Sequence, residues 1–142
     1  MDRVPVWSCE IPDQPGAAAA KLAYLAQAGA NLEYIESQRL PNKPGMGVLY
    51  VAPVTGPTQV RAARAAGLTE TDFPIIRRIE GDNAAGLAHK LTQQWAIAGI
   101  SLHGLTMAVL SDQFVGYAVF DTIGDANRAA QILADLGTSV GK

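Results

Sequence analysis

The chain aligns with itself without a gap when it is shifted by 70 residues. Identical pairs at this spacing include Glu10/Glu80, Gly16/Gly86, Ala18/Ala88, Ala26/Ala96, Ala28/Ala98, Gly29/Gly99, Leu32/Leu102 and Gly67/Gly137. Pairs of similar type lie between them, such as Asp13 with Asn83 and Asn31 with Ser101. A fixed internal period constrains the fold more strongly than any local pattern does. The sequence therefore predicts two copies of one small unit, with domains at residues 1–72 and 73–142.

Each copy of about 70 residues is too small to build a large core alone, so we expect the copies to pack on each other or on a second chain. Only 17% of the 142 residues are charged, and the net charge is −2 without a basic cluster. This balance argues against nucleic acid and anionic membranes as partners. The first residues lack the apolar stretch of a signal peptide, and Cys9 is the only cysteine. We therefore expect a cytoplasmic protein, in the form of a homodimer.

Hydrophobic alternation and turn residues predict the same order of elements in both copies. The first copy has expected strands at 4–11, 32–40 and 47–53, helices at 17–28 and 57–66, and a short edge strand within 68–73. The second copy has expected strands at 75–80, 102–110 and 114–122, helices at 84–98 and 126–136, and little or no strand after Gly137. The expected N-terminal caps of the helices are Asp13 or Gln14, Asp82 or Asn83, and Asp125.

The order strand, helix, strand, strand, helix, strand folds as an antiparallel sheet with both helices on one face. The predicted fold class is therefore α+β, with two ferredoxin-like sandwiches in tandem.

One segment of the first copy carries a more specific pattern. Residues 10–16 read Glu-Ile-Pro-Asp-Gln-Pro-Gly, an Ala- and Leu-rich helix follows, and residues 29–32 read Gly-Ala-Asn-Leu. Residues 80–86 and 99–102 repeat a thinner version in the second copy. This combination resembles the ACT domain family, in which an Asp- or Asn-x-Pro-Gly turn precedes the first helix and Gly-x-Asn begins the second strand. The resemblance covers nearly the whole chain and is greatest to stand-alone tandem ACT proteins.

The resemblance implies a regulatory protein, not an enzyme, that binds a small amino acid at an interface between two ACT units. The positions that it implies for ligand contact are Asp13, Gln14, Gly16 and Asn31 in the first copy and Asn83, Gly86 and Ser101 in the second copy. The second copy has Ala85 in place of the Pro and Ser101 in place of the Asn, which weakens the pattern there.

Elementary chemistry supports such a site independently of the family. Free N–H groups at the start of a helix attract an α-carboxylate, and a glycine lets the ligand approach the backbone. The carboxylate of Asp13 and the amide oxygen of Asn31 can accept hydrogen bonds from an α-ammonium group. A few charge-assisted bonds, less the cost of association, correspond to about micromolar affinity.

Simpler roles for these residues remain open. Asp13 and Asn83 serve equally well as helix caps, and Asn31 suits a turn. His89 and His103 have no cysteine or acidic partner at ligand spacing, so no metal or other cofactor is expected. No catalytic residue stands out. A ligand-free subunit that binds a regulated protein partner through its sheet edges is the alternative function. A small ferredoxin-like hydrolase is disfavoured because the turn at residues 12–16 contains no arginine.

Overall fold

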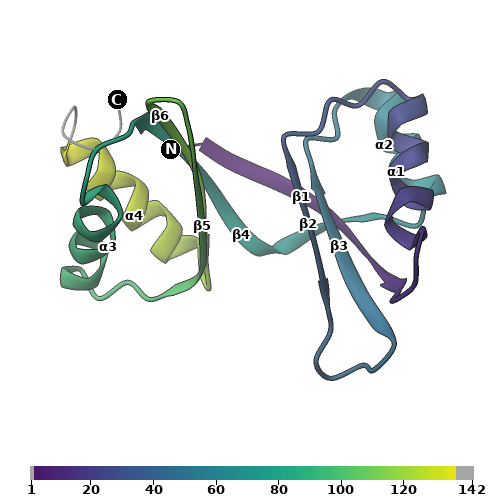
Figure 1. Cartoon of the computed structure of the whole chain (residues 1–142), viewed down its shortest axis with the longest axis horizontal. Coiled ribbons are helices and arrows are strands. Elements are labelled where there is room, and N and C mark those ends of the chain that lie inside the picture. The colour runs from purple at the N-terminus through teal and green to yellow at the C-terminus, as the bar shows by residue number, and fades with distance from the viewer. Residues whose placement is uncertain (1, 137–142) are drawn as a thin grey trace. The chain divides into compact units, whose positions relative to one another are not determined.

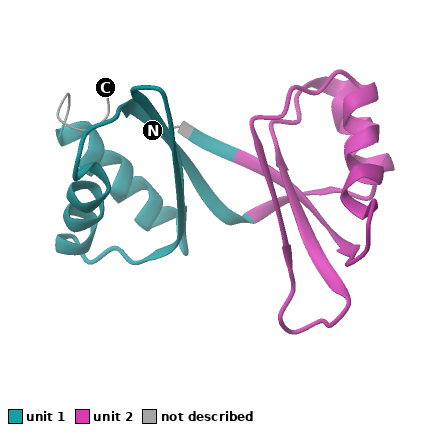
Figure 2. Cartoon of the chain, viewed as in Figure 1, with its two compact units in different colours: residues 1–4, 73–142 teal, residues 5–72 magenta. Residues whose placement is uncertain are grey.

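The computed structural model describes residues 2–136, which divide into two compact units. One unit comprises residues 5–72, and the other comprises residues 73–136 together with residues 2–4 (Figure 2). No helix of the described residues is long and apolar enough to cross a membrane.

The unit of residues 5–72 contains two helices, two complete strands and parts of two others. Its elements are β1 (Asp2–Pro12), α1 (Ala17–Gln27), β2 (Tyr34–Arg39), β3 (Met46–Ala52), α2 (Gly56–Ala65) and the beginning of β4 (Thr69–Asp82). The strands β2, β3 and β1 lie in that order and are antiparallel. Both helices cover the same face of this sheet (Figure 1).

The second unit repeats this arrangement. It contains the rest of β4, α3 (Leu87–Ile97), β5 (Leu102–Leu110), β6 (Gln113–Phe120) and α4 (Ile123–Leu136). The strand order is β4-β6-β5, again antiparallel, with α3 and α4 on one face (Figure 1). The predicted α+β class, with two ferredoxin-like sandwiches, is therefore confirmed.

Each unit has its own apolar core between its sheet and its helices. In the first unit, Trp7, Ile11 and Leu49 pack against Leu25 of α1, as the alternation along β1 predicts. In the second unit, Leu91 and Trp95 of α3 pack against Phe120 of β6, and the two rings meet edge to face. The indole N–H of Trp95 donates to the carbonyl of Ala129 at 3.2 Å, so the ring also joins α3 to α4.

The fourth strand of each unit differs from the expectation. The predicted edge strand at 68–73 and the predicted strand at 75–80 form one continuous strand, β4, whose first residues belong to one unit and whose remainder belongs to the other. In the second unit, residues 2–4 of β1 neighbour β4 and occupy the position of a fourth strand. The expectation about the chain after Gly137 lies outside the described residues.

The predicted helix caps are wrong. The N-cap residues of α1 and α3 are Gly16 and Gly86, two and three residues after the candidate caps Gln14 and Asn83. Helix α1 begins at Ala17, as predicted, whereas α3 begins at Leu87, three residues later than predicted. Both glycines have positive φ, 84° and 80°, which the absence of a Cβ allows. For α4, the hydroxyl of Thr122 accepts from the N–H of Asp125 at 3.0 Å, so the capping side chain precedes Asp125.

Candidate functional site

A tight turn connects β1 to α1 in the first unit. The N–H of Asp13 donates to the carbonyl of Gly45 at 2.9 Å, which ties the turn to the loop between β2 and β3. The N–H of Gln14 donates to Pro12 at 2.9 Å, and the N–H of Ala17 donates to Gln14 at 3.3 Å. These bonds use the polar backbone groups of the turn and fix the direction in which α1 begins.

The start of α1 has unused donors. The first regular helical bond runs from the N–H of Ala20 to the carbonyl of Gly16 at 3.0 Å, so the N–H groups of Ala18 and Ala19 lie before the helical ladder. Within the described residues, no side chain caps this helix end. Open N–H groups together with the helix dipole favour a negatively charged group at this position.

A hollow of about 460 Å³ lies beside this helix start, within the first unit. Its lining residues come from β1, the turn, α1, β2 and β3: Ile11, Pro12, Asp13, Gln14, Gly16, Ala17, Ala18, Ala19, Ser37, Gln38, Arg39 and Gly47. The volume lies within the range of small-ligand sites, and apolar walls with a few polar groups are typical of them. The hollow thus brings together three of the predicted site residues: Asp13, Gln14 and Gly16.

Arg39 is a site residue that the sequence reasoning missed. Its Nε donates to Oδ2 of Asp13 at 2.8 Å, and both side chains are exposed. Arg39 is paired with Gly47 across the sheet, and Pro12 is paired with Met46, so strand register brings the last residue of β2 to the turn. The terminal NH₂ groups of Arg39 have no partner among the described residues and can bind an additional oxyanion.

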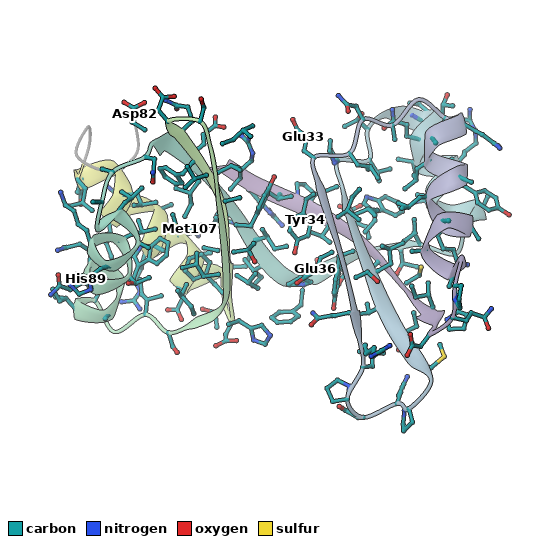
Figure 3. All side chains as sticks on the ribbon, in the orientation of Figure 1. Glu33, Tyr34, Glu36, Asp82, His89 and Met107 are labelled. Carbon is teal, nitrogen blue, oxygen red and sulfur yellow. The ribbon has the colours of Figure 1, made fainter. Side chains whose placement is uncertain are left out.

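The side chains of β2 alternate between the two faces of the sheet. Ser37 is paired with Leu49, which belongs to the core under the helices, so Ser37 and Arg39 lie on the helix side. Tyr34 and Glu36 lie on the opposite face, where the Tyr34 hydroxyl donates to the Glu36 carboxylate at 2.8 Å (Figure 3). The alternation explains why Arg39 reaches the hollow and Glu36 does not.

Gly47 allows the strands to approach closely at the edge of the hollow. A Cβ at this position would lie 3.0 Å from the carbonyl oxygen of Gln38. Because that oxygen belongs to the backbone of the neighbouring strand, it cannot move aside without shifting β2. Gly47 therefore helps to set the position of Arg39.

Asn31 does not join these residues within its own unit. It follows the C-terminal end of α1, whereas Gly16 precedes the N-terminal end, and the 11 residues of the helix span roughly 16 Å. Asn31 does not line the hollow. An arrangement in which Asn31 and Asp13 contact one ligand molecule would therefore need two units, and this part of the site remains a prediction.

The corresponding turn of the second unit is built differently. The N–H of Asn83 donates to the carbonyl of Asp112 at 2.8 Å, and the Asp82 carboxylate accepts from the amide of Gln113 at 2.6 Å. Gly86 is the N-cap of α3, and Ser101 lies after the far end of that helix. The residue 70 positions after Arg39 is Val109, an exposed apolar side chain. The second turn therefore lacks the acid–guanidinium pair of the first.

Other reactive side chains do not form a site. Burial raises the pKa of the Cys9 thiol, against a smaller opposing effect of Lys21, which disfavours the nucleophilic thiolate. Among the described residues, no three His, Cys, Asp or Glu side chains gather as metal ligands would. Although residues 12–16 contain no arginine, Arg39 lies beside this turn in space.

Comparison with known proteins gives structural relatives only. No family profile and no curated protein sequence matches the chain. Protein BT0572 from Bacteroides thetaiotaomicron has a similar structure, with a TM-score of 0.76, 12% identity, and coverage of 94% of this chain and 88% of that one. The regulatory subunits of aspartate kinase from Thermus thermophilus and Thermus flavus give TM-scores of 0.56 and 0.57, identities of 19% and 21%, and 93% coverage of both chains.

These similarities concern the fold, which the neighbouring structures and the two repeated sandwiches define as ACT-like. They extend over nearly the full length of this chain.

Proposed function

We propose that the chain is a non-enzymatic regulatory protein that binds a small amino acid at the turn between β1 and α1. The observation that carries the proposal is the hollow of about 460 Å³ at an uncapped helix start, with an acidic and a basic side chain at its rim. Two of the structural neighbours are regulatory subunits of aspartate kinase, which agrees with a regulatory role.

The charges of the hollow match those of an α-amino acid. The ligand carboxylate accepts hydrogen bonds from the N–H groups of Ala18 and Ala19, and its ammonium group donates to Asp13. Oδ2 of Asp13 already accepts from Arg39, so the ammonium group uses Oδ1. Arg39 holds the Asp13 carboxylate in position while its terminal NH₂ groups stay available for the ligand.

Asn31 and Ser101 enter this proposal only through a second ACT unit, as the family resemblance implies. We propose a cytoplasmic homodimer in which Asn31 of one unit completes the site at Asp13 of another. The site at Asn83 and Gly86 is the weaker one, because Val109 stands at the position that corresponds to Arg39. Ligand binding would then alter the pairing of the units and so regulate a protein partner.

A thermal-shift panel of the twenty amino acids identifies the ligand, followed by calorimetry on variants. Asp13→Ala should reduce the affinity for the identified amino acid about tenfold or more, since a charge-assisted hydrogen bond contributes roughly 1.5–3 kcal/mol. Asn83→Ala, at the matching position of the second copy, should change it much less. Equal losses in the two variants, or no loss in either, would contradict the assignment of the site to the first copy.

A ligand-free assembly subunit is the second candidate function. Strand β5 is the terminal strand of its sheet, and its only residue with a titratable side chain is His103. Val109 and Leu110 near its end are 56% and 81% exposed. Such an edge favours pairing with another strand. No thermal response to any amino acid, together with a stable complex with one protein partner, would favour this candidate.

A small hydrolase would need an arginine beside the turn, and Arg39 lies there. The net charge beside the turn is nevertheless unsuitable for binding a phosphate group. Asp13 engages Arg39 and places a negative charge where a phosphate group would bind. We therefore keep the non-enzymatic role as the proposal.

A further inference from the structure

Arg77 is a buried cation in the second unit. It is only 6% exposed, and it is paired across the sheet with Ala118, which is part of the core under α3 and α4. Arg77 therefore extends from β4 into the helix-covered side of the sheet. A charged side chain at such a position costs several kcal/mol unless an opposite charge or good hydrogen bonds compensate it.

The partners that the structure gives Arg77 are all neutral. Its Nη2 donates to Oδ1 of Asn127 on α4 at 3.1 Å, and its Nη1 makes a long contact of 3.4 Å with the carbonyl of Ile76. Among the described residues, no carboxylate forms an ion pair with Arg77. The acid nearest to Asn127 along α4, Asp125, is already paired with Arg128 at 2.9 Å.

A second arginine adds to the positive charge. Residues 2–4 neighbour β4 within this unit, and Arg3 is exposed there. Burial and, to a smaller extent, the charge of Arg3 lower the pKa of Arg77. A buried guanidinium group with a second positive charge on the neighbouring strand is an arrangement that a bound anion would stabilise.

The side chain of Arg77 lies next to solvent on one side. Arg77 keeps 6% of its surface exposed, and Asn127, whose Oδ1 accepts from it, is exposed. A small anion can therefore approach Arg77 from the side of Asn127. We propose that Arg77, Arg3 and Asn127 form a binding site for a small oxyanion of the phosphate or carboxylate class, separate from the hollow at α1. A phosphate oxygen would accept from both arginines, and the Asn127 side-chain amide would donate to it.

Thermal unfolding of the full chain tests the site, with inorganic phosphate and acetate as separate probes at constant ionic strength. At about ten times its Kd, the bound anion should raise Tm by roughly 3–6 °C. Arg77→Met, which keeps an unbranched apolar side chain and removes the guanidinium group, should remove this rise. Arg61→Met, which removes an exposed arginine on α2 and changes the net charge equally, should keep it. The probe that gives the larger rise identifies phosphate or carboxylate as the preferred class.

Asn127→Asp keeps the proposal testable if Arg77→Met does not fold. It places a carboxylate where Oδ1 now lies, 3.1 Å from Nη2 of Arg77, and so supplies the missing counter-charge from within the chain. We expect Asn127→Asp to raise Tm in the absence of added anion and to abolish the response to phosphate and acetate.

Three results would overturn the site: no anion-dependent rise in the wild-type chain, an equal rise in Arg77→Met, or an undiminished rise in Asn127→Asp. Anions that only bind at the start of α1 or act on water structure would give such an equal rise, because neither effect involves Arg77.

Discussion

Gly16 and Gly86 form a matched pair for testing how the two helix starts contribute to stability and to binding. Each is the N-cap of its helix with φ near +80°, and a Cβ added to either would have nothing within 4 Å. Replacement by alanine therefore meets no steric obstacle, and its cost is that of the left-handed backbone alone. We expect Gly16→Ala and Gly86→Ala each to lower the free energy of unfolding by about 1–2 kcal/mol.

Urea unfolding measures this cost. For an m-value of about 2 kcal/mol/M, a loss of 1–2 kcal/mol lowers the midpoint by roughly 0.5–1 M. The control is Gly16→Asn, because asparagine tolerates the left-handed region better than alanine. This variant should retain part of the lost stability. Binding measurements distinguish the two positions, since of these two glycines only Gly16 lines the hollow. Gly16→Ala should lower the affinity for the amino acid that the thermal-shift panel identifies, and Gly86→Ala should leave that affinity unchanged.

Two results would refute this reasoning. A loss well above 3 kcal/mol for Gly16→Ala would mean that the added methyl group meets an obstacle that the structure does not contain. Equal losses for Gly16→Ala and Gly16→Asn would mean that the left-handed backbone is not the origin of the cost.

Two other predictions concern strand packing and pH. Gly47→Ala should destabilise the chain by more than Gly16→Ala does, because its Cβ would lie 3.0 Å from the Gln38 carbonyl oxygen. The urea midpoints of the two variants measure this difference. An unchanged midpoint for Gly47→Ala would mean that β2 shifts at little cost. Burial raises the pKa of the Cys9 thiol and, with a smaller effect of Glu36, the pKa of the Tyr50 hydroxyl, from ordinary values of 9.0 and 10.0. The folded state therefore retains these protons longer than the unfolded state, so stability is complete below about pH 9 and falls as pH rises. The double variant Cys9→Ala/Tyr50→Phe should flatten the decline in unfolding free energy between pH 8 and 11, and an unchanged decline would count against these shifts.

The repeat, the element order and the fold class could be predicted from the sequence because each depends on local signals. Alternation along β1 places Trp7 and Ile11 on the helix face, and Gly29 and Gly99 end the first helix of each copy with positive φ. The start of α1 at Ala17 could be predicted, but the N-cap residues could not, since polar residues in both turns offered plausible side-chain caps. The structure uses glycine N-caps and engages Asp13 with an arginine instead.

Arg39 was missed because its role depends on strand register. Asp13 and Arg39 are 26 residues apart, and their pairing follows from the antiparallel alignment of β1, β3 and β2. A register shift of one residue would turn Arg39 to the other face of the sheet. The burial of Arg77 could not be predicted for a similar reason, since the sequence of a strand does not reveal that an arginine lies under a helix.

The position of residues 2–4 beside β4 has a practical consequence for the expression of the second unit alone. A fragment that begins at residue 73 lacks residues 2–4, so one side of β4 would be left with unsatisfied backbone groups and a tendency to self-associate. Grafting the opening segment of the protein onto the free end of such a fragment, through a flexible linker, should restore a monodisperse product.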